Sequence, residues 1–319
     1  MDQYFLIEQK RWVRRVLSSW RRSRLDHRFI PSGRDEIRLF TVVRNEMLRL
    51  PYFFSYYRQL GVTRFFVVDN HSDDGTLEYL LAQSDVHVWS TRETYTRQEA
   101  WVDGLIRRFG RAGWSVVIDV DELLVWPGHG TLSLRALLDQ LDAQGANAMH
   151  ALQLDMYPEG SLRDAAYRAG DPFLPAAPWF DPASHRIIPY PYRNCTTDFP
   201  RRFIGGVRER VFGLKDVCLS KFPLLRFHTG MFLRQGTHAV EGARIASPRG
   251  CILHFKYLSD FGPRVKYEAV RGEHWNGAVQ YKAYAGAISQ NPDLCFRDEM
   301  SVRFQNPEQL LHLGLMKNG

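Results

Sequence analysis

The sequence predicts an α/β protein in which a mixed, mostly parallel sheet is flanked by helices. Two observations favour this class. Short apolar runs of strand length alternate with amphipathic stretches of helical length between residues 36 and 155, which is typical of βαβ units. The chain also has 319 residues, 45% of them hydrophobic, and can therefore bury a full core.

The first half of the chain is expected to contain five strands and four helices in alternation. The strands are rich in β-branched and aromatic residues, and the helices carry apolar residues three or four positions apart. The expected strands are 37–43, 64–69, 86–90, 114–119 and 146–154, and the expected helices are 51–60, 76–83, 96–109 and 132–141. Because ligands bind beyond the carboxyl ends of parallel strands, we expect a site there.

The second half of the chain is less regular. Residues 157–200 are rich in proline, aromatic residues and arginine, and predict a long irregular excursion over the surface. Regular structure is expected to resume at 203–212 and 219–227. A further strand is expected within 250–257, and helices after Pro263.

The net charge of +7 belongs to an N-terminal arm. Between Lys10 and Arg28 lie eight basic residues and one acid, so this segment accounts for the whole net charge. Apolar residues from Trp12 to Trp20 gather on one face of a predicted helix. Such a helix fits an anionic membrane surface, and it fits equally well against the protein's own body or a partner subunit. A nucleic-acid groove is not expected, because the basic charge is not spread over the fold.

Neither a targeting segment nor a redox motif is expected. No apolar run approaches the roughly 20 residues that cross a bilayer, and no apolar segment follows the basic N-terminus as in a secretory signal. The four cysteines form no C-x-x-C pair, so a zinc cluster is not expected. We expect a cytoplasmic protein, and the arm at residues 10–28 is the candidate for peripheral contact with the inner face of a membrane, with packing on the body or a partner as the alternative.

The sharpest chemical signal is the sequence Asp119-Val120-Asp121-Glu122. It follows the apolar run Val116-Val117-Ile118, which places three acids at the end of a buried strand. Two aspartates one residue apart can share a hard cation such as Mn²⁺ or Mg²⁺, and that cation can neutralise a diphosphate. A solvated surface turn is the alternative, but it does not explain acids directly after so apolar a strand.

Two further strand ends carry polar motifs. The first expected strand ends in Thr41-Val-Val-Arg-Asn-Glu46, and the second in Val68-Asp-Asn-His-Ser-Asp-Asp-Gly-Thr76. Together with the acidic motif, in this order, they resemble the glycosyltransferase family 2-like and family 92-like enzymes of GT-A fold. The resemblance covers residues 36–130. Within that range a further block lies at 96–101, and beyond it the resemblance weakens toward residue 260 through shorter blocks at 205–210, 221–223, 236–238 and 254–256.

The resemblance implies a GT-A-type, Rossmann-like fold and a role for each matched residue. Arg44, Asn45, Glu46 and Asp69 would line the nucleotide pocket, where Asp69 can accept a hydrogen bond from an imide N–H such as that of uracil. Asp119 would contact ribose or the cation, and Asp121 the cation directly. The other residues implied to bind the donor or the cation are Gln98, Lys256 and His254.

His254 and Lys256 are open to two interpretations. A lone histidine after an apolar strand is often a satisfied core residue, but in GT-A enzymes a late histidine completes the shell of the cation. Lys256 shares the strand face of His254 and could hold the departing diphosphate. An inverting reaction would also need a carboxylate base. Glu209 and Asp155 are the candidates, and each could instead be an ion-pair partner of nearby arginines.

The resemblance divides the chain into an arm at 1–35, a nucleotide-sugar-binding half at 36–155, and an acceptor-side half with C-terminal helices at 156–319. It implies a metal-dependent glycosyltransferase of hexosyltransferase type. The donor would be a nucleotide sugar, UDP-linked in the first instance. The acceptor would be a glycan or a lipid-linked saccharide in cell-surface polysaccharide synthesis.

Two other functions stay open. A haloacid-dehalogenase-like phosphatase also carries D-x-D after a strand, although its motif normally opens the first strand of the domain. A non-catalytic carbohydrate-binding protein of the same fold is the second. A dinucleotide enzyme is not expected without G-x-G-x-x-G after the first strand, and residues 41–46 lack the glycines of a sugar-nucleotide pyrophosphorylase.

Overall fold

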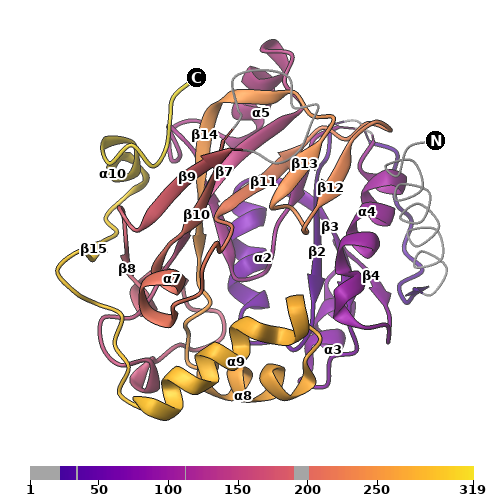
Figure 1. Ribbon diagram of the computed structural model, residues 1–319. Coiled ribbons are helices and arrows are strands. Elements are labelled where there is room, and N and C mark those ends of the chain that lie inside the picture. Colours follow the sequence, from indigo (N-terminus) through magenta and orange to yellow (C-terminus); the bar gives the residue numbers. More distant parts are fainter. Residues whose placement is uncertain (1–21, 34, 112, 190–200) are drawn as a thin grey trace, which may run out of the picture.

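The computed structural model describes residues 22–33, 35–111, 113–189 and 201–319. Among these residues, nine strands form one large sheet (Figure 1). From one edge to the other they are β1 (Ser23–Arg24), β4 (Val86–Ser90), β3 (Val62–Asp69), β2 (Ile37–Val43), β5 (Ser115–Val117), β11 (Ser220–Leu225), β7 (Ala148–Asp155), β14 (Ile245–His254) and β6 (Glu122–Val125).

The sheet is mixed. Parallel pairs join β4 to β3, β3 to β2, β2 to β5, and β7 to β14. β11 lies between β5 and β7 and is antiparallel to both, while β1 and β6 are antiparallel at the two edges. The predicted α/β class is therefore confirmed, but the sheet is not mostly parallel as predicted, because four of its eight strand pairs are antiparallel. The two halves predicted from the sequence share one sheet, because β11 and β14 come from the second half.

Helices cover both faces of this sheet (Figure 1). On one face, α2 (Leu50–Gln59), α3 (Thr76–Ala82) and α5 (Leu134–Ala143) contribute to a core with Leu39 and Val43 of β2. On the other face, α4 (Gln98–Phe109) and the β12–β13 hairpin (Phe232–Arg234 and Ala239–Glu241) pack with Phe40 and Val42. Since alternate β2 side chains enter opposite cores, the whole strand is buried, and Arg38 and Thr41 are its two polar residues.

Two C-terminal helices lie at the carboxyl ends of the parallel strands. α8 (Phe261–Arg271) and α9 (Trp275–Gln290) run below the sheet in Figure 1 and share a core cluster with Tyr157 and Val207. The helices expected after Pro263 are thus present. The remaining elements are η1 (Tyr95–Arg97), η2 (Leu162–Asp164), α6 (Phe173–Ala176), β8 (Trp179–Phe180), β9 (His185–Pro189), β10 (Arg201–Gly205), α7 (Val207–Phe212), β15 (Val302–Arg303) and α10 (Pro307–His312).

The excursion expected at 157–200 is less irregular than predicted. Its described residues include β8 and β9, which pair antiparallel with β15 and β10. Both partner strands lie outside the excursion, and β15 is more than a hundred positions away. A strand that is completed by so distant a partner needs no periodicity of its own, which is why the local pattern did not predict it.

The strand expected at 114–119 also differs. β5 ends at Val117, and Glu122 begins a separate edge strand, β6, which the sequence did not predict. In the connection between them, the backbone N–H of Glu122 donates to the Asp119 carbonyl at 3.1 Å. Asp119 and Asp121 therefore lie in a tight link between two strands of one sheet, and not ahead of a helix.

Only the end of the basic arm is described. The apolar face at Trp12–Trp20 lies outside the described residues, but Arg24 and Arg28 are bonded to the protein's own body. Arg24 lies opposite Trp89 in the antiparallel β1–β4 pair, and Arg28 donates to the Val86 carbonyl at 2.8 Å. Within the described part of the chain, no helix has the length and apolar character that a bilayer span requires.

Candidate active site at the strand ends

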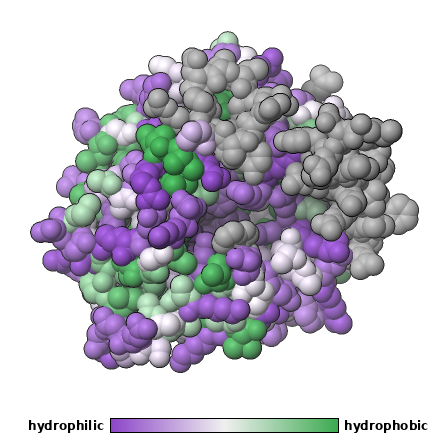
Figure 2. Space-filling view, viewed as in Figure 1, coloured by the Kyte–Doolittle hydropathy of each residue, from purple (hydrophilic) through white to green (hydrophobic). Residues whose placement is uncertain are grey.

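Strand register gathers the predicted site residues. His254 lies opposite Asp155 of the parallel neighbour β7 and opposite Glu122 of the antiparallel neighbour β6. Likewise, Val43 lies opposite Asp69, so the motifs after β2 and β3 are adjacent. The carboxyl ends of these strands therefore meet on one side of the sheet, and Figure 2 shows mostly hydrophilic side chains around a hollow on this face of the molecule.

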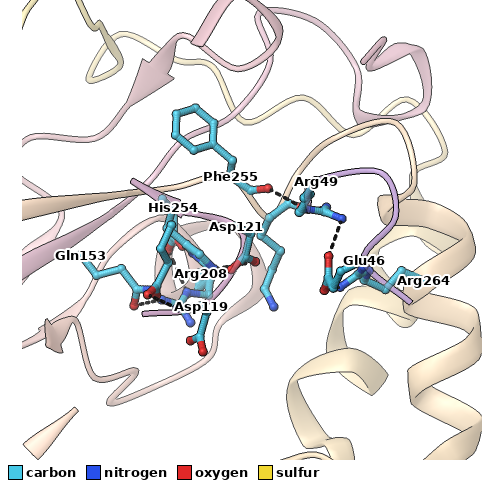
Figure 3. Close-up of polar contacts among 12 residues, drawn as sticks. Glu46, Arg49, Asp119, Asp121, Gln153, Arg208, His254, Phe255 and Arg264 are labelled. Carbon is cyan, nitrogen blue, oxygen red and sulfur yellow. Dashed lines mark hydrogen bonds and ion pairs between the residues drawn. The ribbon is translucent and has the colours of Figure 1, made fainter. Parts of the chain in front are cut away.

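His254 is the centre of a row of charged side chains in contact with one another. Its Nε2 lies 3.2 Å from Asp121 Oδ2, and its Nδ1 lies 2.5 Å from Asp155 Oδ1. The other Asp155 oxygen accepts a hydrogen bond from Arg208 Nε at 2.8 Å. Figure 3 shows Asp121 in the centre, with His254 and Arg208 on one side and Arg49, Glu46 and Arg264 on the other. The backbone also holds Asp121, because Phe255 N–H donates to its carbonyl at 2.6 Å.

The charges in this row of side chains shift the pKa values of Asp121, His254 and Asp155. Burial alone would raise the pKa of Asp121, but His254 and Lys256 outweigh it and hold that pKa well below its usual range. Burial would lower the pKa of His254, yet the two carboxylates raise it to about 9. Arg208 and His254 likewise lower the pKa of Asp155 to about 2, against its burial. Without a bound cation, the imidazolium is thus the positive charge between two carboxylates.

Asp121 and His254 fit a divalent cation. With Nδ1 donating to Asp155, a neutral imidazole presents its lone pair at Nε2, directly toward Asp121. Histidine ligands of metal ions usually donate their other N–H to a carboxylate in this way. No group of three or more His, Cys, Asp or Glu side chains in the described residues is arranged as a ready cation site. Further ligands would therefore have to come from a bound anion or from water.

Asp119 lies in a different contact. Its Oδ2 accepts a hydrogen bond from Lys221 Nζ at 2.7 Å, and the same ammonium lies 2.9 Å from Glu122 Oε1. Gln153 donates to Glu122 Oε1 at 2.8 Å. Burial raises the pKa of Glu122 to about 7, despite Lys221. Of the three predicted cation ligands, the structure thus brings Asp121 and His254 together. The third, Asp119, lies beside Lys221, which the sequence analysis named only within the matching block 221–223.

The predicted nucleotide residues form a hydrogen-bonded wall after β2 and β3. Arg44 donates to the Asn70 carbonyl at 2.7 Å and to the Tyr267 hydroxyl at 2.6 Å. Asn45 and Asp73 exchange two hydrogen bonds, at 2.8 and 2.9 Å. Asn45 has φ 54°, a left-handed conformation that asparagine tolerates better than most residues.

Two buried carboxylates lie in the same wall. Glu46 is bonded to Arg264 at 2.5 Å and to Arg49 at 3.4 Å. Asp69 is fully buried, and burial raises its pKa. Its carboxylate accepts hydrogen bonds of 3.3 and 3.4 Å from Ser72 N–H, and hydrogen bonds from Ser72 and His71 partly offset the effect of burial on its pKa.

Gln98 and Lys256 border the acidic motif. Gln98 lines a cavity of about 80 Å³ between α4 and the turn of the β12–β13 hairpin, together with Asp119, Lys221 and His238. Lys256 lies over the ring of Tyr281 at 4.9 Å, and its hydrogen-bond partner among the described residues is the Tyr281 hydroxyl at 3.4 Å. Nearby tyrosines and Asp121 raise the pKa of Lys256 against its burial, so the ammonium stays charged.

The two candidate bases are both ion-paired. Asp155 has one oxygen on His254 and the other on Arg208. Glu209 of α7 faces the β9–β10 hairpin, where Arg186 donates to Oε1 at 2.5 Å. Arg208, the preceding residue of α7, is the one that reaches the cluster around His254. The structure therefore brings Asp155 into the site, but turns Glu209 toward Arg186.

Comparison with known proteins gives one informative similarity. Over 96 residues the chain is 31% identical to a glycosyltransferase family 92 protein of rice, Oryza sativa subsp. japonica. The match covers 29% of this chain and 16% of the rice protein, so the chain spans only a small part of that relative. No protein-family model matches the sequence. The similarity supports a glycosyltransferase-like protein and, in general terms, glycosyl transfer.

Proposed function

We propose that this protein is a metal-dependent glycosyltransferase that moves a hexose from a nucleoside diphosphate sugar, UDP-linked in the first instance, to a glycan or lipid-linked acceptor. The observation that carries the proposal is the Asp121–His254 pair at the strand ends, braced by Asp155. Its placement beside the wall formed by Arg44, Asn45 and Asp69 suits a ligand with both a diphosphate and a base. The similarity to a family 92 glycosyltransferase supports the same class.

The chemistry of donor cleavage explains the charged groups. Departure of a nucleoside diphosphate leaves negative charge on a phosphate oxygen, and Mn²⁺ or Mg²⁺ held by Asp121 and His254 would stabilise that charge. Lys256 carries an ammonium that no carboxylate of the described residues neutralises by a hydrogen bond, so it suits the same diphosphate. At the end of β3, Asp69 would accept a hydrogen bond from an imide N–H of the base.

We assign Asp155 to a supporting role. Both of its oxygens are engaged, which favours orientation of His254 over acceptance of a proton from the acceptor hydroxyl. Glu209 is paired with Arg186 through Oε1, while its Oε2 is buried with no hydrogen-bond partner among the described residues, so it would serve as the base only if an acceptor reached that oxygen. If the reaction inverts the anomeric centre, the half-exposed carboxylate of Asp119 is a further group at the cavity that can take up the proton.

One observation favours a second candidate function. The Asp119 side chain is 50% exposed and its charge is balanced by Lys221, so it is also a carboxylate that can attack a phosphate ester. This is the arrangement that a phosphatase would need. A phosphatase activity that is abolished by Asp119→Asn would favour this alternative.

The test is release of nucleoside diphosphate from a panel of nucleotide sugars with Mn²⁺. We expect at least one donor to be hydrolysed or transferred, and Asp121→Ala to abolish the release because it removes a cation ligand. Asp139→Ala, an exposed aspartate on α5, is the matched control and should behave as the wild type. No binding and no turnover with any donor would refute the transferase.

We further propose that the protein resides in the cytoplasm, where the arm at residues 10–28 makes peripheral contact with anionic lipid. Since Arg24 and Arg28 are bonded to the body, deletion of residues 1–21 leaves the described anchoring contacts intact. Vesicles that contain phosphatidylserine should sediment the full chain and not the truncated one. Equal sedimentation of both proteins would show that the arm does not bind lipid.

A further inference from the structure

Lys221 is a buried cation inside the acidic motif. The residue is 3% exposed, and its ammonium donates to Asp119 Oδ2 at 2.7 Å and lies 2.9 Å from Glu122 Oε1. Glu122 is fully buried, so its charge is costly without this partner. Both carboxylates raise the pKa of Lys221 against the effect of burial. The lysine is therefore a permanent positive charge at this position.

The surrounding hydrogen bonds fix this arrangement. Asp119 N–H donates to Glu122 Oε2 at 3.1 Å, and Gln153 donates to Glu122 Oε1 at 2.8 Å. Glu122 thereby holds the backbone of Asp119 with one oxygen, and Lys221 and Gln153 with the other. Asp121, two positions along, faces His254 Nε2 at 3.2 Å. Two neighbouring aspartates of one motif thus meet two different positively charged groups.

We propose that Lys221 is a positioning residue that divides the motif Asp119-Val120-Asp121-Glu122 between two cations. Its ammonium is the built-in cation of Asp119 and Glu122, and it leaves Asp121 and His254 for an exchangeable divalent cation. This inference rests on the proposed function, because it concerns the cation of the same site. In this assignment Lys221 holds Asp119 and Glu122, and Asp119 is not a ligand of the divalent cation.

The division has a consequence for donor binding. A divalent cation held by one carboxylate and one imidazole has few protein ligands, whereas such ions prefer about six. The missing ligands must be water or the oxygens of a diphosphate, so ion and nucleotide should bind cooperatively. If Lys221 did not hold Asp119, a second carboxylate could complete the shell and the ion would bind tightly without nucleotide.

The first test is direct Mn²⁺ binding, followed by the electron paramagnetic resonance signal of the free ion. Wild type, Asp119→Asn and Asp121→Asn are titrated without nucleotide and with saturating UDP. Without nucleotide, we expect Asp121→Asn to lower Mn²⁺ affinity by about tenfold or more, and Asp119→Asn to lower it much less, by the loss of a nearby charge alone. Equal losses in the two variants would overturn the division of the motif.

The second test removes Lys221, so that Asp119 becomes free to bind the ion. Lys221→Met is combined with Glu122→Gln, so that no buried carboxylate is left without a partner. We expect the double variant to bind Mn²⁺ more tightly than the wild type, and added Asp119→Asn to remove the gain. Lys256→Met is the matched control, because Lys256 is a second lysine near Asp121 that donates to no carboxylate among the described residues. Removing its charge can raise Mn²⁺ affinity, but Asp119→Asn should not reverse that increase.

The outcomes separate this inference from the proposed function. A gain in the Lys221 variant that survives Asp119→Asn would be a general charge effect and would overturn the inference. Absence of Mn²⁺ binding in the wild type, with and without UDP, would overturn it together with the cation site. Mn²⁺ binding divided as expected, but with no donor turned over, would uphold the inference and contradict only the transferase.

Discussion

At the scale of single residues, the site depends on how buried charges are paired. His254 can bind a cation through Nε2 only in the neutral tautomer with its proton on Nδ1, and Asp155 Oδ1, 2.5 Å from Nδ1, favours that tautomer. Arg208 in turn balances Asp155 from α7. Asp155 would not touch the ion itself, but it sets the tautomer of His254, which would.

We predict that Asp155→Asn lowers Mn²⁺ affinity about 10- to 100-fold, because the second partner of a metal-binding histidine is lost. Asp181→Asn is the matched control, since Asp181 is also buried and pairs with Arg210 of the same helix. Both changes should reduce the free energy of unfolding, by about 3 kcal/mol each. Equal Mn²⁺ affinity in the two variants would show that Asp155 only stabilises the fold.

At the scale of elements, α8 holds the wall of the nucleotide pocket. Arg264, Tyr267 and Arg271 are spaced by three and four positions and so lie on one face of the helix. They bond to Glu46, to Arg44 and to the Asn70 side chain, respectively. One face of α8 is thus hydrogen-bonded to the loops after both β2 and β3. The position of the helix therefore fixes the positions of these two loops.

We predict that Arg264→Met lowers the free energy of unfolding by about 3 kcal/mol, because Glu46 is left buried with only the 3.4 Å contact to Arg49. Urea denaturation measures this. Adding Glu46→Gln should recover part of the loss, since no uncompensated charge then remains. Lys266→Met, an exposed change on the same helix, should have little effect. The account of α8 fails if Arg264→Met and Lys266→Met are equally stable.

A pH-dependent contact secures the first edge of the sheet. Asp26 accepts hydrogen bonds from Val88 N–H and His87, each at 2.9 Å, and pairs with Arg24. Burial would raise the pKa of Asp26, but these bonds outweigh it and hold the pKa well below its usual range. A lowered pKa means that the contact stabilises the fold above the unfolded pKa, near 4, and is lost as pH falls through the lower folded value.

We therefore predict that Asp26→Asn costs about 2 kcal/mol of unfolding free energy at pH 7, as for a lost hydrogen-bond group with charge. The difference from the wild type should shrink below about pH 4, where Asp26 of the unfolded wild type is protonated. Urea denaturation at both pH values checks this, with Asp139→Asn as an exposed control. A difference that persists unchanged into acid would contradict the charged contact.

At the scale of the whole molecule, the first half of the fold could be predicted and the assembly could not. β2 and β4 lie at the predicted residues 37–43 and 86–90, because their apolar runs report local burial. β6 and β8 are completed by strands far along the chain, which leaves no local signal. The large sheet is mixed because β6 and β11 also pair antiparallel with strands far away in the sequence.

The same limit applies to the candidate site. Asp121 and His254 could be singled out because each follows an apolar strand. The contact of Lys221 with Asp119 joins residues 102 positions apart, and depends on β11 entering the sheet beside β5. The turn of Glu209 toward Arg186 likewise follows from the β9–β10 hairpin. Residue types could be predicted, whereas their partners required the fold.

The central claim is that Asp121 and His254 hold a divalent cation for a nucleoside diphosphate at the strand ends. A crystal structure of the protein with UDP and Mn²⁺ tests it most directly. The account predicts anomalous density for Mn²⁺ about 2.1 Å from an Asp121 oxygen and His254 Nε2, bridged to the diphosphate, with the base near Asp69. Mn²⁺ and UDP bound elsewhere, or His254 still paired with Asp121 in a complex that contains UDP, would contradict it.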